Sequence, residues 1–394
     1  MQKILFSVNN MNINGIKTSL LNLLNSIDYK YYSVDLFLLE KSGTLLKSVP
    51  NNVNVVAFED FAAIKEMAYL PFKDALNHLI RSRRFAEVFR YCYYSIKAYI
   101  SSDDGVLYRY LLGKIPSLAE EYDYAISYFG PLDVLSYYVL TKTKANKKDQ
   151  WVHFDVNQIN FDEKFASQYY PMFNRVIAVS EKAKKNLNER LPGLAIDSFI
   201  LDSPVSSIIE LSQKCPVSYK EEYFQIVTIG RLTLQKGPDI ALDIARKLSE
   251  QGIKYQWHFI GGGGLFESLQ KKIKQYQLDD CFILEGEQVN PYRYLVNADL
   301  YVQPSRHEGY GLTIQEAKIL CLPIICTDFA GADEQIIDGI SGVVVKNDID
   351  SLKDAIIDLY LHDEKRESFR MYLQNLDLRS LHSNMIADMF PEES

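Results

Sequence analysis

The chain has 394 residues, of which 47% are hydrophobic and 24% are charged, as is usual for a globular protein. This length exceeds one ordinary hydrophobic core and predicts about two domains. The formal net charge of −8 argues against a nucleic-acid-binding protein, which would usually carry an excess of basic residues.

Segments that would direct the chain to a membrane or out of the cell are not apparent. We find no run of about 18 apolar residues and therefore expect no transmembrane helix. The first ten residues, MQKILFSVNN, lack a charged region followed by an apolar signal core and instead predict a strand. Five cysteines without a zinc-like spacing are typical of a reducing compartment. We therefore expect a cytoplasmic protein.

The first βα unit begins at the N-terminus. A β-rich run over Lys3–Val8 is followed by a turn-rich loop and then by helical apolar spacing. Gly15 stands at or near the start of this helix, where the missing Cβ lets the backbone approach a ligand closely. A plain turn glycine is the alternative that the sequence leaves open. The next strands are predicted at Val34–Leu39 and Val53–Ala57.

The segment 63–115 is helical in pattern and crowded with aromatic and basic residues. One interpretation is a surface on which the rings meet a lipid interface and the cations meet its phosphates. The other is a helical insertion that packs the rings into its own core. Aromatic residues suit helix packing, which favours the second interpretation.

A further strand is predicted at Tyr124–Tyr128, then a helix to Leu140 and a basic loop at 142–148. The short strand Gln150–Phe154 places His153 at its carboxyl end. Ligands bind at that edge of open parallel sheets, so His153 is a candidate binding residue. A structural role is the alternative for a single histidine.

The second half begins after a connection at 200–206 and a polar linker at 210–222. The strand Phe224–Gly230 leads into a loop with Arg231 and Lys236, and a helix follows. Arginine offers a planar fork of donors and lysine a mobile point charge, which together suit a diphosphate. Two exposed cations at a turn are the alternative.

The stretch 299–316 combines a strand, a glycine turn and the start of a helix. Unpaired amides and the positive end of the helix dipole face an anion in such units. Glu308 lies in the turn and Glu316 about one turn into the helix, with seven residues between them. The remaining strands of this half are predicted at Trp257–Ile260, Phe282–Glu285, Pro323–Cys326 and Gly342–Val345.

The string from Glu308 to Leu312, followed by Glu316 and Ala317, resembles the motif of retaining GT-B glycosyltransferases. The similarity is to family four, glycosyl transferases group 1, of the bacterial surface-polysaccharide type. The resemblance implies that Glu316 binds the ribose hydroxyls and that Glu308 contacts the donor sugar. The turn amides would hold the sugar and diphosphate, and they belong to Gly309, Tyr310, Gly311 and Leu312.

Other segments extend the resemblance. Relatives place the same arginine and lysine as Arg231 and Lys236 after the same strand, and His153 resembles a histidine held against the donor. Near Gly15 relatives often carry two glycines, whereas here Asn14 precedes a single one. The resemblance implies an α/β GT-B fold of two Rossmann-like domains facing a central cleft. Residues 1–203 would bind the acceptor, with a helical insertion at about 60–115. Residues 204–378 would bind the nucleotide-sugar, and a last helix at 379–394 would cross back to the first domain.

The implied activity is retaining transfer of a sugar, most often from UDP, to a glycan or lipid-linked acceptor in surface-polysaccharide synthesis. No metal or other cofactor is implied, because the chain has no Asp-x-Asp and the two cations can do a metal's electrostatic work. The expected partners are the donor and acceptor, with peripheral association with the inner membrane face and no nucleic acid. Two rival functions are a sugar-nucleotide epimerase of the same fold and a non-catalytic partner subunit of a transferase.

Overall fold

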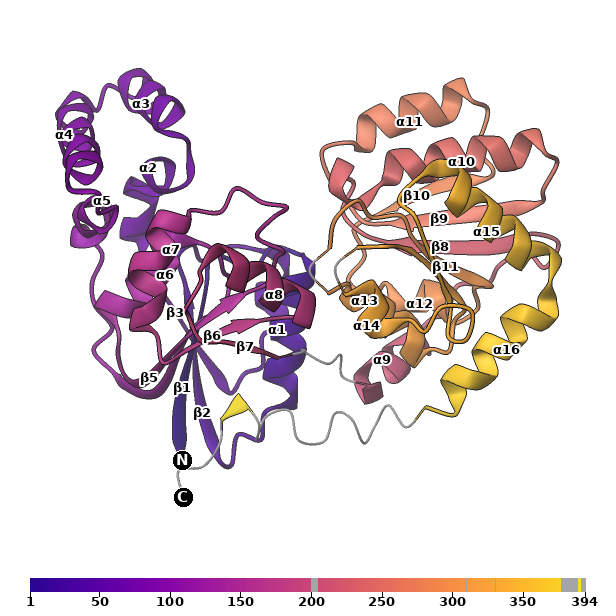
Figure 1. Cartoon of the computed structure of the whole chain (residues 1–394), viewed down its shortest axis with the longest axis horizontal. Helices are drawn as coiled ribbons and strands as arrows, with labels where there is room; N and C mark the ends of the chain where they lie inside the picture. Colours follow the sequence, from indigo (N-terminus) through magenta and orange to yellow (C-terminus); the bar gives the residue numbers. More distant parts are fainter. Residues whose placement is uncertain (200–204, 309, 330, 377–388, 391–394) are drawn as a thin grey trace. The chain divides into compact units, whose positions relative to one another are not determined.

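The computed structural model describes residues 1–199, 205–308, 310–329, 331–376 and 389–390, without the side chain of Ser206. Internal contacts divide the chain into two compact units, Met1–Phe199 and Ile200–Ser394 (Figure 1). The predicted connection at 200–206 lies mostly outside the described residues, as do all but two residues of the predicted last helix. Their predicted roles stay predictions.

The N-terminal unit is built on a parallel sheet of seven strands in the order β3-β2-β1-β4-β5-β6-β7. Its strands are β1 Gln2–Val8, β2 Tyr32–Leu38, β3 Val53–Ala57, β4 Glu121–Ser127, β5 Lys144–Val152, β6 Arg175–Ala178 and β7 Ile196–Ser198. The strand order reverses between the neighbouring strands β1 and β4, where Ile4 pairs with Tyr124. This reversal is the switch point at which open parallel sheets bind ligands.

Helices connect these strands, as parallel pairing requires. They are α1 Gly15–Ser26, α2 Lys65–Tyr69, α3 Phe72–Arg81, α4 Phe85–Ser101, α5 Gly105–Leu111, α6 Asp133–Lys142, α7 Glu163–Tyr169 and α8 Glu181–Arg190. Helices α2 to α5 form the aromatic and basic segment between β3 and β4. Some of its rings pack together, since Phe72 stacks on the buried Tyr91 at 5.4 Å and Tyr94 stacks on Tyr110 at 4.3 Å.

The C-terminal unit repeats this plan with a parallel six-stranded sheet in the order β10-β9-β8-β11-β12-β13. Its strands are β8 Phe224–Ile229, β9 Tyr255–Ile260, β10 Phe282–Gly286, β11 Leu300–Gln303, β12 Ile324–Thr327 and β13 Val343–Val345. Its helices are α9 Val205–Ser212, α10 Pro238–Glu250, α11 Phe266–Gln275, α12 Tyr292–Leu295, α13 Leu312–Ile319, α14 Ala332–Gln335, α15 Ile349–Leu361 and α16 Asp363–Gln374.

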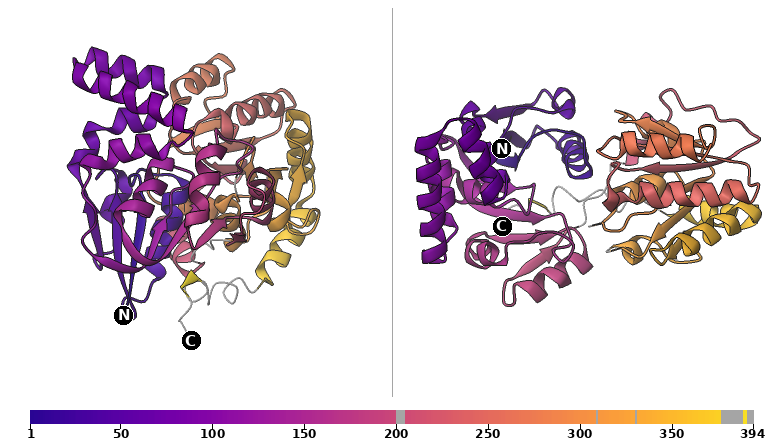
Figure 2. Two further views of the ribbon diagram at one scale, coloured as in Figure 1. Left: turned by 60° about the vertical axis from the view of Figure 1, so that its left-hand side comes forward. Right: turned by 90° about the horizontal axis from the view of Figure 1, so that it is seen from above.

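Helices cover both faces of the second sheet (Figures 1 and 2). Alternate residues of β8 serve the two faces, as strand geometry dictates. Ile226 joins the core beneath α10, α11 and α15, whereas Val227 joins the core beneath α9, α12 and α13. Two parallel sheets with crossover helices confirm the predicted α/β class.

The structure corrects two sequence predictions. The segment 142–148, predicted as a basic loop, forms the end of α6 and the first half of β5, because its backbone pairs in parallel with β4, with Lys144 opposite Glu121 and Lys148 opposite Ala125. Lys144 lies 3.6 Å from Glu121, and Asn146 donates to Asp123 at 3.2 Å. The predicted connection and linker contain α9, which is anchored by the fully buried Ile208. Within the described residues, no helix is both long enough and apolar enough to span a bilayer.

Candidate functional site

Two loops leave the carboxyl edge of the C-terminal sheet side by side. Strands β8 and β11 are hydrogen-bonded neighbours, with Leu300 opposite Ile226 and Tyr301 opposite Val227. The strand order reverses between them, so this is the switch point of the sheet. The loop 230–237 follows β8 and the loop 304–311 follows β11. Five of the residues that the sequence predicts for the donor site therefore lie on adjacent loops, namely Arg231, Lys236, Glu308, Tyr310 and Gly311.

Arg306 joins these two loops. Its backbone amide donates to the Gln235 carbonyl at 2.8 Å, and its guanidinium donates to the Leu234 carbonyl at 2.6 Å. The same guanidinium binds both carboxylate oxygens of Asp239, at 2.8 and 2.7 Å. Burial alone would raise the pKa of Asp239, but these charged hydrogen bonds hold it below its usual value. The sequence did not identify Arg306, since its partners lie about seventy positions earlier.

Glu308 lies at the centre of a polar network. Its Oε1 accepts hydrogen bonds from Gln303 at 2.9 Å and from Ser305 at 3.0 Å. Lys236, from the other loop, forms an ion pair with the same oxygen. Both members of the pair are largely buried, which strengthens their attraction relative to a pair in water. The structure thus brings together two predicted site residues that are 72 positions apart.

Arg231 is arranged differently from Lys236. Its side chain is exposed, and no hydrogen bond or ion pair joins it to any residue that the structure describes. Two positions later, the buried hydroxyl of Thr233 also lacks a hydrogen-bond partner among those residues. Buried polar atoms are almost always satisfied, so such a group commonly marks the place of a ligand or water. This loop therefore presents an unengaged guanidinium beside an unsatisfied hydroxyl.

The turn after β11 requires glycine at position 311. Gly311 has φ +85°, and a Cβ added there would lie 2.9 Å from the ring of Phe329. Gln335 of α14 fixes the turn by donating to the carbonyls of Tyr310 and Gly311. Leu312 is the first residue of α13, and Gly309 lies outside the described residues. Gln335 of α14 thus holds in place the turn and the start of α13.

Glu316 lies on α13 and is almost completely buried. The Tyr292 hydroxyl donates to its Oε1 at 3.1 Å. Burial raises the pKa of Glu316 to about 7, although the bond from Tyr292 opposes the shift. At neutral pH this carboxyl is close to half protonated, and it can both accept and donate hydrogen bonds. Tyr292 was not identified from the sequence, because nothing marks a tyrosine 24 residues away as a partner.

In the N-terminal unit, Gly15 is the first residue of α1, directly after β1 and its loop. The side chain of Asn14 caps the helix by accepting from the Lys17 amide at 3.0 Å. A Cβ added at Gly15 would meet no atom within 4 Å, so packing does not require glycine there. The first amides of any helix lack intrahelical partners. Gly15 therefore lies at an open helix start on the carboxyl edge of its sheet.

His153 follows β5 on the same edge. Its ring is buried, lies 4.7 Å from the Tyr128 ring and stacks on Trp151 at 5.7 Å. Burial lowers its pKa to about 3, against a raising effect from a hydrogen bond to the Tyr128 backbone. The imidazole is therefore neutral at physiological pH. Its buried Nε2 has no hydrogen-bond partner among the described residues.

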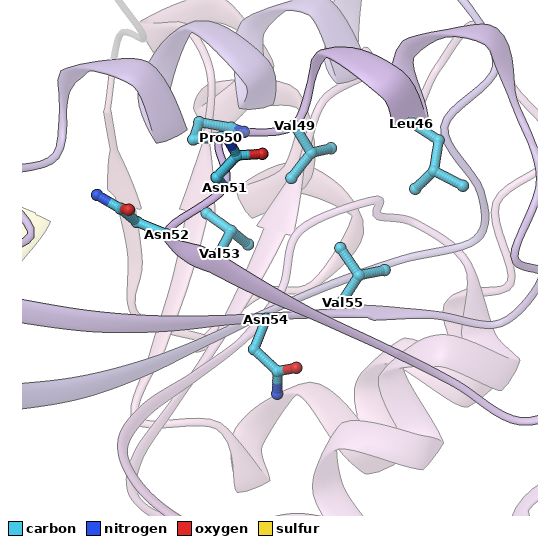
Figure 3. A pocket seen from close by; sticks show the side chains of 8 residues that line it. All are labelled: Leu46, Val49, Pro50, Asn51, Asn52, Val53, Asn54 and Val55. Atoms are coloured by element: carbon cyan, nitrogen blue, oxygen red, sulfur yellow. The ribbon is translucent and has the colours of Figure 1, made fainter.

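A shallow depression of about 490 Å³ lies elsewhere on the N-terminal unit, between the short helix η1 (Thr44–Ser48) and β3 (Figure 3). Its lining residues are Leu46 and the run from Val49 to Val55. None of the predicted site residues is among them. It adjoins the amino end of β3, opposite to the edge at which parallel sheets bind ligands.

Comparison with known proteins identifies the C-terminal unit. Residues 213–375 match the family model described as glycosyl transferases group 1. The chain is 24% identical over 242 residues to the 2-deoxystreptamine N-acetyl-D-glucosaminyltransferase of Niallia circulans, covering 59% of this chain and 61% of that protein. It is 32% identical over 126 residues to the amylovoran biosynthesis glycosyltransferase AmsK of Erwinia amylovora, covering 30% and 31% respectively. The chain thus spans between 31% and 61% of the length of these curated relatives.

Solved structures match over the whole chain. A mutant of TarM from S. aureus, in complex with fondaparinux, alpha-GlcNAc-glycerol and UDP, aligns with a TM-score of 0.70 at 15% identity. The alignment covers 100% of both chains, and at this identity it establishes the fold. The chain therefore has the GT-B fold, and its residues 213–375 match the glycosyl transferases group 1 family.

Proposed function

We propose that the protein is a retaining glycosyltransferase of family four that uses a UDP-sugar as donor. The observation that carries the proposal is the pair of loops at the β8–β11 switch point. Arg231 and Lys236 come from one loop, Glu308 comes from the other, and Glu316 lies on the following helix. The names of the curated relatives support the transferase class, and the UDP bound to the TarM mutant supports the carrier.

In this proposal the donor diphosphate lies against the cationic loop and the start of α13. Arg231 supplies its unengaged guanidinium, and Lys236 turns from Glu308 toward a phosphate oxygen. The amides of Gly309, Tyr310, Gly311 and Leu312 and the positive end of the helix dipole complete the anion site. These groups stabilise the charge that develops on the leaving nucleoside diphosphate.

The remaining residues hold the sugar side of the donor. Glu316 accepts from the ribose hydroxyls, and Glu308 accepts from the transferred sugar once Lys236 engages the phosphate. His153, which is neutral, offers a single uncharged hydrogen bond to the donor. Gly15 lets the backbone of α1 approach the ligand closely. No metal ion is required in this scheme, because the two cations neutralise the diphosphate.

During transfer the acceptor hydroxyl oxygen bonds to the anomeric carbon as the bond between that carbon and the diphosphate oxygen breaks. The leaving phosphate takes the acceptor proton, so atoms and charge balance without a protein base. The same face is used by both groups, which retains the configuration. The acceptor is proposed to be a glycan or lipid-linked glycan of a cell-surface polysaccharide, bound by residues 1–203 of a cytoplasmic protein that associates peripherally with the membrane.

A thermal-shift screen tests the donor site with UDP-, GDP- and ADP-sugars. A UDP-sugar at about 100 times its Kd should stabilise the wild type by ~2.7 kcal/mol, and Arg231→Ala should lose most of that shift. Lys271→Ala removes an exposed cation from α11 in the same unit and should keep it. An unchanged shift in Arg231→Ala, or no response to any nucleotide-sugar, would contradict the proposal.

Product analysis separates transfer from epimerisation. The protein is incubated with the preferred UDP-sugar, with and without a glycan acceptor. Transfer requires the acceptor and yields a glycosidic product of the same anomeric configuration as the donor. An isomerised sugar released without acceptor would support the epimerase instead.

A further inference from the structure

The outer face of α4 carries a continuous row of exposed apolar side chains. Its most exposed members are Tyr99 at 82%, Ile100 at 77% and Phe89 at 76%, and the row is completed by Phe85, Tyr93 and Ile96. At about 100° per residue, these six positions fall within an arc of roughly 120°. The opposite face of the helix holds the buried Tyr91 and Ala98. The helix is therefore apolar on both sides, and only one side is covered by its own unit.

This face differs from the scattered apolar residues that normally remain on protein surfaces. Six neighbouring side chains lie on one 17-residue helix. The neighbouring helix α3 and its flanks add exposed Leu70, Phe72 and Ile80. In Figure 1, α3 and α4 lie at the periphery of the N-terminal unit, away from its sheet. Water is a poor environment for such a face, so a partner that covers it would be favoured.

The charge around this face indicates the partner. Between residues 70 and 101 there are six lysines and arginines and only two aspartates and glutamates, a local net charge of +4 in a chain whose total is −8. On α4 itself, Arg90 and Lys97 lie directly beside the apolar arc. They are exposed, and no ion pair joins either of them to a described residue. Arg81, at the end of α3, and Arg83, between α3 and α4, are also exposed, and no ion pair joins either of them to a described residue.

We propose that α4 lies in the plane of an anionic lipid membrane, with its aromatic and aliphatic row in the headgroup and acyl boundary. Arg90 and Lys97 would then contact lipid phosphates at the rim, as in helices that bind membrane interfaces. A second protein copy would carry the same positive charge on the same helix, so self-association would bring like charges together. A lipid surface instead supplies both the apolar phase and the negative charge.

Vesicle co-sedimentation of the full chain, without any donor sugar, tests this proposal independently of transferase activity. Binding to vesicles of phosphatidylcholine with phosphatidylglycerol should exceed binding to phosphatidylcholine alone and should weaken with added salt. The double variant Phe89→Asp and Ile100→Asp should bind at least about tenfold more weakly. The matched control is Leu361→Asp with Met371→Asp, two exposed apolar residues of α15 and α16, and it should bind like the wild type.

Removing the two cations of α4 gives a second test of the proposal. Arg90→Gln with Lys97→Gln should weaken binding to the anionic vesicles about fivefold for each cation, and binding to neutral vesicles should change little. All variants alter exposed positions, so their melting temperatures should match the wild type. Sedimentation velocity without lipid decides between a membrane and a protein partner. A dimer that Phe89→Asp with Ile100→Asp converts to monomers would overturn the proposal, as would equal vesicle binding by that variant and its control.

Discussion

The two sheets have the same strand order around their switch points but present different chemistry there. At the β8–β11 edge the loops are joined by Arg306 and by the Lys236–Glu308 pair, and a further cation stays exposed. At the edge of the N-terminal sheet, His153 is neutral and Gly15 opens a helix start without steric need. One edge is joined by an ion pair between its two loops, whereas the other carries a neutral imidazole, an open helix start and the buried Lys17, which donates to Asn10 at 2.8 Å. In the proposed function the donor diphosphate binds at the edge that has the ion pair and the exposed arginine.

Opposite changes of folding stability with pH, in variants at the two edges, would give the strongest support to this comparison. The folded-state pKa of Glu316, about 7, lies above its unfolded value, so its contribution to stability is present at low pH and is lost as pH rises to about 7. The shift corresponds to a change on the order of 3 kcal/mol. His153 behaves in the opposite way, because its folded pKa of about 3 lies below its unfolded value of about 6.5. Its contribution is lost as pH falls from about 6.5 to 3.

We therefore expect the stability of Glu316→Gln relative to the wild type to increase as the pH is raised from about 5 to about 8. Over the acidic part of that range, up to about pH 6.5, the stability of His153→Phe relative to the wild type should fall as the pH rises. Thermal unfolding of the three proteins at several pH values measures both differences, and constant packing effects cancel within each variant. The same sign for both variants would break the comparison.

Glycine substitutions should distinguish the two edges next. Gly311→Ala forces a Cβ against Phe329 at a positive φ and should cost about 1 to 3 kcal/mol of folding stability. Gly15→Ala has free space and ordinary helical φ, so stability should stay unchanged or rise by up to about 1 kcal/mol. Chemical denaturation measures both. If Gly15→Ala nevertheless weakens nucleotide-sugar binding, close approach of a ligand is supported over a plain turn glycine.

The smallest expected effect concerns the connection between the two charged loops. Arg306→Ala removes the bidentate bond to Asp239 and should cost about 1 to 2 kcal/mol while reducing the UDP-sugar thermal shift. Lys214→Ala, which breaks an exposed pair with Glu210 at 2.7 Å, serves as control and should change stability little without affecting the ligand response. Equal effects of the two variants would show that Arg306 does not organise the site.

Local sequence patterns were sufficient to predict most strands and the order of the loops that carry the candidate site. Largely apolar runs, such as Leu300–Gln303, predict buried parallel strands, and glycine turns predict the loops that follow these strands. The first half of β5 was missed because lysines have low strand propensity, and only the parallel backbone pairing with β4, in which Lys144 lies opposite Glu121, overrides it. Helix α9 was missed because its helical character depends on burying Ile208 against distant elements.

The supporting residues of the site could not be predicted for a related reason. Arg306, Gln335 and Tyr292 act on predicted residues through contacts that only the folded sheet creates. Arg306 lies within the stretch 299–316, but nothing there marks Asp239 as its partner, and Gln335 and Tyr292 lie outside that stretch. The electrostatic state of His153 likewise follows from burial beside Tyr128 and Trp151, which spacing alone does not reveal. Sequence patterns therefore indicated candidate site residues, whereas the hydrogen-bond partners of these residues became apparent only in the folded structure.

The ion pair between Lys236 and Glu308 has a consequence for ligand selection. In this structure the lysine is already paired with a carboxylate, so a simple anion such as free phosphate would have to compete with that carboxylate and would then face its negative charge. A sugar diphosphate brings phosphate oxygens for the lysine together with hydroxyl hydrogens for the carboxylate, and it can compensate both members at once. The closed pair would therefore act as a filter that favours molecules carrying both kinds of group over the more abundant inorganic anions.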